Sequence, residues 1–342
     1  MFDREYFEKN EFVKKIYSFE NLQCIEDQND VMHICFNIDI NFFRPTGVTI
    51  TSILENNSNM KFAFHIFTDA VSKKDLEALE KTTVKYKQSC YVYLMDMAPF
   101  ANFHIKHPRF KKVSYFRLYM PKVLKKITRY FLYIDADLIC INSMEAFKKI
   151  DLEGKVLAAV SDLPEAVKTR SDFLGLKSGK YFNSGVLWID TEKWEENSIT
   201  EKAFSYQGRD PKSFTCHDQD VLNLVMDGDI KFIDEKFNHL GCDGSKVPER
   251  CIIYHFFGRE KPWNLALTEY DKMWRRYLDI SFWDSVDDPL PERKPENYHN
   301  FKQAGKFFRK HHNWQNALKC YLWYAILKVR DRKSTRLNSS HI

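Results

Sequence analysis

Residues 130–138 read YFLYIDADL, an apolar run that ends in Asp135 and Asp137. A short aromatic and β-branched run of this kind predicts a buried strand. Two carboxylates one residue apart at the end of a strand can face one cleft and share a hard divalent cation. The D-x-D pattern recurs at 218/220 and 227/229, but only the first copy follows a clear strand. Since an isolated D-x-D is more often a turn or a helix cap, the motif needs support from the rest of the chain.

On both sides of this run, strand-like and helix-like segments alternate. We expect strands at 31–38, 62–68, 91–95, 130–134, 156–160, 185–189 and 251–256, and helices at 47–55, 73–87, 114–124, 191–206 and 219–226. The alternation predicts an α/β fold with a mainly parallel central sheet covered on both faces. Ligands of such sheets bind beyond the carboxyl ends of the strands, where the polar motifs lie. Residues 1–29 are expected to form an irregular or helical lead-in.

The composition sets limits on size and location. The chain has 342 residues, 44% hydrophobic and 15% aromatic, which suffices for one large α/β domain with an appendage. Its eight cysteines include no C-x-x-C pair and indicate buried thiols of a reducing compartment. The first residues lack the apolar core of a signal peptide, and no stretch approaches the roughly 20 apolar residues of a membrane span. We therefore expect a cytoplasmic protein.

The C-terminal part differs in charge from the rest. Residues 284–300 are rich in Pro, Glu and Asp, as a linker would be, and residues 301–333 contain six lysines, three arginines and one aspartate. Aromatic and aliphatic residues among these cations predict an amphipathic extension, 284–333, that attaches to an anionic membrane surface. The alternative is a helix packed on the body with a solvated basic face. Nucleic-acid binding is disfavoured because the body is slightly acidic. Residues 334–342 (STRLNSSHI) fit neither pattern and are interpreted as a non-native tail.

Two further motifs follow or precede apolar runs. In CIIYHFFGREKPW, residues 251–263, His255 could complete a mixed oxygen and nitrogen metal site, and Lys261 could neutralise phosphate charge. In YFNSGVLWID, residues 181–190, Asn183 and Ser184 offer the small polar groups that sugar hydroxyls need. Taken alone, His255 is more often a hydrogen-bonded core histidine, and the second motif is more often a plain turn before a strand.

Two other segments carry polar side chains at positions where ligands bind. In HDQDVLN, residues 217–223, Asp218 could cap a helix from which Gln219 projects toward a sugar ring. After the first strand, Asp39 could bind a base or ribose, with Phe42 as a stacking surface. The chain has neither G-x-G-x-x-G nor G-x-x-x-x-G-K-[ST], which disfavours a dinucleotide site and a P-loop.

The order and spacing of YIDAD, FNSGV, DQDVLN and HFFGREKPW resemble glycosyltransferase family 8, over residues 31–263. These are retaining enzymes that include glycogenin and bacterial lipopolysaccharide hexosyltransferases. The stretch from Trp283 to Lys328 also resembles the appendage of the lipopolysaccharide subgroup. The resemblance implies a GT-A-type nucleotide-sugar-binding domain, residues 30–283, which transfers glucose or galactose from a UDP-sugar to a core oligosaccharide through an α-1,3 or α-1,2 linkage.

By position, the resemblance assigns roles in three groups. The manganese ligands would be Asp135, Asp137 and His255, with Mg²⁺ as the other candidate ion. The donor would contact Asp39, Asn41, Phe42, Arg117, Asp162, Asn183, Ser184, Gly258 and Lys261. Gln219, Asp218 and Lys261 would act around the transferred hexose and the departing UDP. Two departures are Phe42, where the family often has tyrosine, and Phe257, where a small or polar residue commonly precedes the glycine.

The mechanism and two other functions stay open at this point. Gln219 is a poor nucleophile, so we favour a front-face displacement in which the acceptor hydroxyl attacks beside the leaving phosphate. A sugar nucleotidyltransferase would carry a Gly-rich basic loop after its first strand, which this chain lacks. A non-catalytic carbohydrate-binding protein would not require a set of residues that neutralises a diphosphate.

Overall fold

The computed structural model describes residues 12–21, 30–105, 111–208, 214–241, 246–258, 261–284, 295, 297–310 and 312–338. The chain divides into two compact units, one of residues 1–257 with 280–286 and the other of residues 258–279 with 287–342. The first unit contains the sheets and the second contains the C-terminal helices. Each unit is described by itself.

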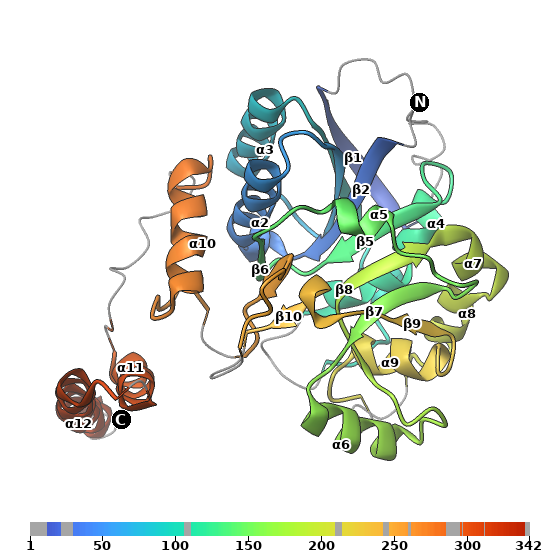
Figure 1. The fold of residues 1–342 in the computed structure, drawn as a ribbon. Helices are drawn as coiled ribbons and strands as arrows, with labels where there is room; N and C mark the ends of the chain where they lie inside the picture. The colour runs from blue at the N-terminus through green and yellow to red at the C-terminus, as the bar shows by residue number, and fades with distance from the viewer. Residues whose placement is uncertain are drawn as a thin grey trace. The chain divides into compact units, whose positions relative to one another are not determined.

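An eight-stranded sheet of order β1-β4-β3-β2-β5-β8-β7-β9 forms the centre of the first unit (Figure 1). Its strands are β1 (Val13–Glu20), β2 (Val31–Ile38), β3 (Lys61–Thr68), β4 (Ser89–Met95), β5 (Tyr130–Ile134), β7 (Leu157–Ser161), β8 (Phe182–Asp190) and β9 (Ile230–Phe232). β4, β3, β2 and β5 run parallel, whereas β8 is antiparallel to both of its neighbours, and β1 is antiparallel to β4. The expected α/β fold with a mainly parallel sheet is confirmed.

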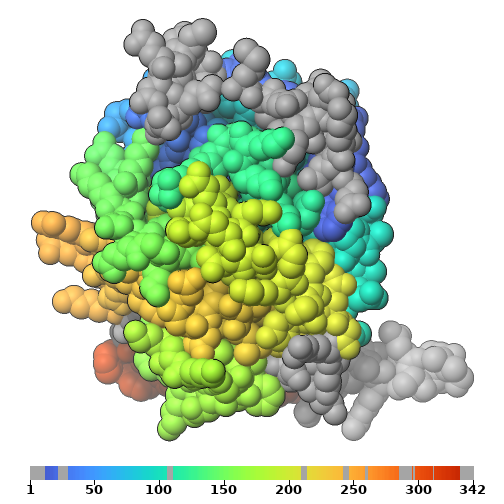
Figure 2. Space-filling model, turned by 90° about the vertical axis from the view of Figure 1, so that its right-hand side faces the viewer, coloured from blue at the N-terminus to red at the C-terminus, as the bar shows by residue number. Residues whose placement is uncertain are grey.

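Helices cover both faces of this sheet. One face carries α2 (Phe43–Asn56) and α3 (Lys73–Tyr86), which lie side by side. On the other face, a large apolar cluster joins the strands to η4 (Lys112–Leu118), α4 (Met120–Leu124), α7 (Thr191–Glu196), α8 (Ile199–Phe204) and α9 (Asp218–Val225). Figure 2 shows a face of the molecule on which the green-to-yellow part of the chain, from α6 (Pro164–Leu174) to β9, forms much of the surface. Shorter elements are η2 (Ile40–Phe42), η3 (Ala98–Phe100), α5 (Glu145–Lys148) and η5 (Glu235–Phe237).

Three predicted elements differ from the structure. Within the expected lead-in, Val13–Glu20 forms the edge strand β1, whose backbone completes the hydrogen-bonding of β4. The expected helix over 191–206 is two helices, because the chain turns at Ser198, where φ is +51°. The helical segment expected over 114–124 begins as the 3₁₀ helix η4 and becomes α-helical only at Met120.

A second, three-stranded sheet carries the end of the D-x-D segment. It has the order β10-β11-β6, formed by His239–Leu240, Ile253–His255 and Leu138–Cys140. Because β6 follows β5 after only three residues, the chain passes from the large sheet to the small one through Asp135 and Asp137. β11 is antiparallel to β6, with His255 opposite Leu138.

Trp283 closes the packing of α2 and α3. Its side chain is fully buried, and its indole lies so close to Gly47 that a Cβ there would meet Cε3 at 2.2 Å. The indole Nε1 donates a hydrogen bond to Asp75 Oδ1 on α3, at 3.3 Å. The glycine in α2 is therefore required by a close side-chain approach.

In the second unit, α11 (Tyr298–Lys310) and α12 (Trp314–Asn338) pack together as an antiparallel pair joined by a short turn. Gly305 of α11 faces the Tyr321 ring of α12, and Ala304, Ala317 and Cys320 are buried. The helix α10 (Glu269–Ile280) precedes them. Among the described helices, none combines the length and apolarity needed to cross a bilayer.

A half-buried histidine, His33, and a fully buried one, His65, connect β2, β3 and β4 and make stability sensitive to acid. His33 Nδ1 lies 2.9 Å from His65 Nε2, and His65 Nδ1 lies 2.9 Å from the Tyr93 hydroxyl. Burial lowers the pKa of His33 to about 4, and burial together with His33 lowers the pKa of His65 well below its ordinary value. Between pH 6.5 and 4 the unfolded chain therefore binds protons that the folded chain does not, so stability falls as the pH falls.

We expect His33→Gln to reduce this acid sensitivity. In urea titrations at pH 7.5 and 4.5, the loss of unfolding free energy on acidification should shrink by up to about 3 kcal/mol relative to wild type. His104→Gln, at an exposed position of the same unit, should leave the loss unchanged. Equal pH dependence in wild type and His33→Gln would contradict the assignment.

Candidate metal and nucleotide-sugar site

The D-x-D segment is anchored to the strand beside it. Asp135 follows the last residue of β5, and its backbone N–H donates to the Gly185 carbonyl of β8, at 2.8 Å. Asp137 immediately precedes β6, and its carbonyl accepts from the Phe256 N–H at 3.0 Å. Both aspartates thus lie where the two sheets meet, at the carboxyl end of β5.

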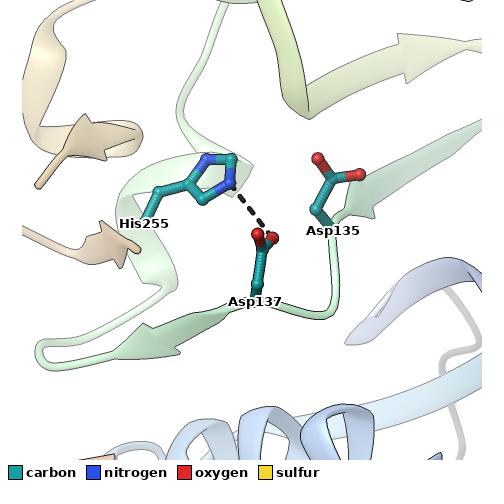
Figure 3. A group of neighbouring side chains, drawn as sticks. All are labelled: Asp135, Asp137 and His255. Atoms are coloured by element: carbon teal, nitrogen blue, oxygen red, sulfur yellow. Dashed lines mark hydrogen bonds and ion pairs between the residues drawn. The ribbon is translucent and has the colours of Figure 1, made fainter. Parts of the chain in front are cut away.

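His255 completes a group of three potential metal ligands. It ends β11, and its Nε2 lies 3.1 Å from Asp137 Oδ1 (Figure 3). One ligand atom from each of Asp135, Asp137 and His255 lies within 4.8 Å of the others. Ligands about 2.1 Å from a six-coordinate ion are about 3 to 4 Å apart, so a small movement would let all three bind one cation. Two carboxylates and an imidazole suit a first-row divalent ion such as Mn²⁺, with Mg²⁺ less suited because it prefers oxygen ligands.

Gly185 is required beneath the histidine ring. A Cβ at this position would meet His255 Cε1 at 2.4 Å and Nδ1 at 2.9 Å. The glycine of the FNSGV motif therefore leaves space for the His255 side chain from the other sheet, and it lies within β8, not in a turn. The structure gives this glycine a role different from the plain turn considered from sequence.

We expect Gly185→Ala to displace His255 and weaken metal binding. The added methyl group cannot be accommodated without moving the ring away from Asp137, so the Kd for Mn²⁺ should rise at least about tenfold. Isothermal titration calorimetry measures this directly. Val186→Ala, a cavity-forming change at the next buried position of β8, should lower stability while leaving the Kd unchanged.

Arg117 connects three parts of the site. It comes from η4 and is 7% exposed, and its Nη2 donates to Asp135 Oδ1 at 3.0 Å while its Nε lies 2.8 Å from Asp218 Oδ2. Nη1 donates to the carbonyl and hydroxyl oxygens of Ser184, at 2.8 and 2.7 Å. Although burial disfavours the guanidinium charge, Asp218 and the other acidic neighbours hold the pKa of Arg117 above its ordinary value. A fixed positive charge therefore stands beside the predicted metal ligands.

Asp218 does not cap the helix α9, contrary to expectation. His217 occupies the N-cap with a φ of +51° and makes no side-chain cap hydrogen bond, while Asp218 is the first helical residue. Its buried carboxylate faces Arg117 instead. Burial raises the pKa of Asp218 to about 6, and Asp135 adds to the increase, whereas Arg117 lowers it. The carboxylate is part of a buried charge network.

The predicted sugar-facing residues form one hydrogen-bonded group. Gln219 Nε2 donates to Asp162 Oδ2 at 2.8 Å and to the Tyr181 hydroxyl at 3.0 Å. Gln219 Oε1 accepts from Ser184 N at 2.9 Å and from Ser184 Oγ at 3.2 Å. Asn183 Nδ2 lies 3.4 Å from the same Asp162 oxygen. Residues from three separate segments thus form a dense polar group beside the predicted metal ligands.

Asp39, Asn41 and Phe42 lie just past β2. Asp39 is buried and caps η2, accepting the Asn41 N–H at 2.7 Å, while Asn41 is exposed and Phe42 half-buried. Since β2 and β5 are parallel neighbours, this segment and the D-x-D segment follow the same edge of the sheet.

Gly258 and Lys261 belong to the second unit. Gly258 has a φ of +104°, a left-handed conformation that favours glycine. Lys261 begins a turn, and its backbone carbonyl accepts hydrogen bonds from the N–H groups of Asn264 and Leu265. Arg275 of α10 holds this turn by donating to the carbonyls of Pro262 and Trp263, at 2.7 and 2.6 Å.

Two residues near the predicted metal ligands were not predicted from the sequence. The Tyr133 hydroxyl contacts Asp135 Oδ1, Asn37 Oδ1 and Arg117 Nη2, so it supports the first aspartate. Asn238, which is fully buried, lies with its Oδ1 3.1 Å from His255 Nδ1. Tyr133 could have been suspected from its place in the strand two residues before Asp135, but Asn238 has no local signal.

Comparison with known proteins agrees with this geometry. The profile of glycosyl transferase family 8 matches residues 33–266. A lipopolysaccharide 1,2-glucosyltransferase of Escherichia coli is 28% identical to this chain, and the alignment covers 82% of this chain and 86% of the relative. A lipopolysaccharide 1,3-galactosyltransferase of Salmonella typhimurium is 26% identical, and the alignment covers 96% of this chain and 99% of the relative.

Among solved structures, the galactosyltransferase LgtC in complex with donor and acceptor sugar analogs superposes with a TM-score of 0.63 at 20% identity, covering 76% of this chain and 98% of LgtC. This likeness confirms the expected GT-A-type fold. The profile spans more than half of the chain and includes every motif that forms the site. The chain belongs to glycosyl transferase family 8.

Proposed function

We propose that this protein is a metal-dependent, retaining hexosyltransferase that moves glucose or galactose from a UDP-sugar to a lipopolysaccharide core oligosaccharide, through an α-1,3 or α-1,2 linkage. The observation that carries the proposal is the continuity of the site. The cluster of Asp135, Asp137 and His255 adjoins the polar group of Asp162, Asn183 and Gln219. The names of the relatives, lipopolysaccharide glucosyl- and galactosyltransferases, support the acceptor class.

Within this proposal, Asp135, Asp137 and His255 would hold Mn²⁺, or less favourably Mg²⁺. The bound ion would neutralise charge that develops on the departing UDP. By the family resemblance, Lys261 would contribute a second positive charge to diphosphate binding, and Gly258 would contact the diphosphate through its backbone. At the nucleoside end of the donor, Asp39 and Asn41 would hold uridine and Phe42 would stack on it.

The polar group orients the transferred sugar. Both ends of the Gln219 amide are engaged, since Oε1 accepts from Ser184 and Nε2 donates to Asp162 and Tyr181. An amide held in this way is suited to positioning, and it would have to give up these hydrogen bonds to attack the anomeric carbon. This arrangement supports a front-face displacement in which the acceptor hydroxyl attacks on the side that the phosphate leaves.

A donor panel tests this function. UDP release from UDP-glucose, UDP-galactose and other UDP-hexoses is measured with Mn²⁺, Mg²⁺ or EDTA, with and without core oligosaccharide acceptors. We expect release that requires metal and rises with acceptor, and an α-linked product by NMR. Binding of a UDP-hexose with no release under any of these conditions would favour the alternative, a non-catalytic carbohydrate-binding protein.

The proposal includes a peripheral position on the inner face of the cytoplasmic membrane. Large apolar side chains spaced three to four residues apart line one side of α12 and are 39–73% exposed: Trp314, Leu318, Leu322, Ile326 and Val329. The basic residues of α11 and α12 complement anionic lipid, and aromatic and aliphatic side chains can enter the headgroup region.

Vesicle sedimentation tests this attachment. Binding to vesicles containing phosphatidylglycerol should exceed binding to pure phosphatidylcholine, should fall at high salt, and should weaken at least about tenfold in Leu318→Asp/Leu322→Asp. Phe173→Asp, which alters an exposed apolar residue on α6, should bind as wild type does. Equal binding to both lipids would contradict the electrostatic part of this proposal.

A further inference from the structure

A chain of buried hydrogen bonds leads from the backbone of β8 to His255. It starts at the Gly185 N–H, which donates to Asn183 Oδ1 at 3.0 Å. A backbone amide can only donate, so the oxygen and the nitrogen of the Asn183 side chain cannot be exchanged. The other end of the amide supports the same orientation, because Nδ2 donates toward a carboxylate oxygen of Asp162, which can only accept.

The orientation of Asn183 determines that of Asn238. Asn183 Oδ1 also faces the Asn238 side chain, at 2.9 Å, and an oxygen there requires a donor. Asn238 must therefore turn its Nδ2 toward Asn183 and its Oδ1 toward His255. The backbone of Asn238 is itself held, since its N–H donates to the Glu235 carbonyl at 3.1 Å.

The orientation of Asn238 in turn determines where His255 carries its proton. Asn238 Oδ1 is an acceptor 3.1 Å from His255 Nδ1, so that nitrogen must be protonated. In the neutral ring, Nε2 is then left with a lone pair directed at Asp137 Oδ1, 3.1 Å away. A lone pair and a carboxylate oxygen repel each other unless a cation lies near both, which is the arrangement that a shared metal ion would satisfy.

We propose that Asn238 is a positioning residue that fixes the Nδ1–H form of His255 and so presents Nε2 to the divalent cation shared with Asp137. The inference rests on the metal site of the proposed function, but it concerns the protonation of one nitrogen, which is measurable without substrate or turnover. Asn238 is fully buried and comes from the segment before β10, so the pairing of β10 with β11 brings it beside the histidine.

Protonation of Nδ1 is tested on protein labelled with ¹⁵N-histidine. Long-range ¹H–¹⁵N correlation spectra of the metal-free, full-length protein report the proton on each ring nitrogen, and the His255 signals are those lost in His255→Gln. We expect a proton on Nδ1 in wild type and in Asn238→Asp, which keeps an acceptor but loses the donor to Asn183. Asn238→Leu has a similar volume but no acceptor, so its Nδ1 should lose the proton in at least part of the population, whether or not Nε2 is protonated.

Metal affinity gives an independent measurement on the same variants. By calorimetry, the Kd for Mn²⁺ should rise about 10- to 100-fold in Asn238→Leu and change less in Asn238→Asp. Asn57→Leu is the matched control, because Asn57 is a buried amide that bonds Ile53 and Met144 and belongs to no part of the site. It should lose stability and keep its affinity for Mn²⁺.

Two results would overturn the assignment of Asn238. One is an unprotonated Nδ1 in wild type. The other is a loss of affinity that follows stability equally in Asn238→Asp, Asn238→Leu and Asn57→Leu, since that pattern would indicate a structural role alone. A protonated Nδ1 that depends on Asn238, in a protein that binds no Mn²⁺, would support the assignment and refute the metal site of the proposed function.

Discussion

Asp137→Asn is expected to lower the rate of UDP release by about three orders of magnitude. The change keeps the size of the side chain but removes the negative charge that faces His255 Nε2. A divalent ion contributes several kcal/mol to stabilising charge in the transition state, and each 1.36 kcal/mol corresponds to a factor of ten in rate. The measurement is kcat with saturating UDP-hexose and acceptor. Mn²⁺ is raised to about 10 times the concentration that saturates wild type, which for a weak site is on the order of millimolar.

The matched control is Asp229→Asn, which alters another of the three D-x-D motifs. Asp229 is 40% exposed and pairs with Lys155 at 3.5 Å, so its rate should stay within about a factor of two of wild type. If Asp137→Asn and EDTA both left UDP release unchanged, the metal site itself would be refuted.

Arg117→Met is expected to lower the free energy of unfolding by about 3–5 kcal/mol, since it removes the cation from a buried charge network. The loss would leave Asp218 and Asp135 without their shared partner, and the Ser184 backbone carbonyl without a donor. Urea unfolding at pH 7 measures the effect. Because the pKa of Asp218 is already about 6, removal of Arg117 should raise it further.

A raised pKa in the folded state gives this variant a distinctive pH dependence. The folded protein would bind a proton that the unfolded chain releases, so the stability of Arg117→Met should fall as the pH rises from 5 to 8. Adding Asp218→Asn should remove that slope and restore part of the stability. Lys125→Met, which breaks an exposed pair with Glu195, should cost less than about 1 kcal/mol. A loss of similar size in Arg117→Met and Lys125→Met would contradict a buried network.

The sequence predicted the elements whose apolar pattern is strong. β2, β3, β5 and α3 lie within a residue or two of their expected bounds, because buried strands and an amphipathic helix have a clear periodicity. β1 was missed because an edge strand with lysines and a glutamate among its apolar residues carries a weak signal. The break at Ser198 was missed although Asn197 and Ser198 favour turns.

For the site, local motifs predicted the residues that end strands, and the structure brings Asp135, Asp137 and His255 together. What local patterns could not predict is contact between distant segments. The capping role of Asp218 was wrong because its partner, Arg117, comes from η4, about a hundred residues earlier in the chain. Asn238 was not predicted for the same reason, since only the pairing of β10 with β11 places it beside His255.

The indole of Trp283 determines where the chain can be truncated to give a stable fragment of the first unit. The family profile ends at residue 266, yet Trp283 fills the space above Gly47 and bonds to Asp75. A truncation at 266 would leave that space open and expose apolar surface of α2, at a cost comparable to the about 3–5 kcal/mol of removing a buried tryptophan. A fragment that ends at residue 286 retains the whole first unit. The boundary for expressing the catalytic part without α11 and α12 is therefore set by one aromatic ring, which lies beyond the last residue that the family profile matches.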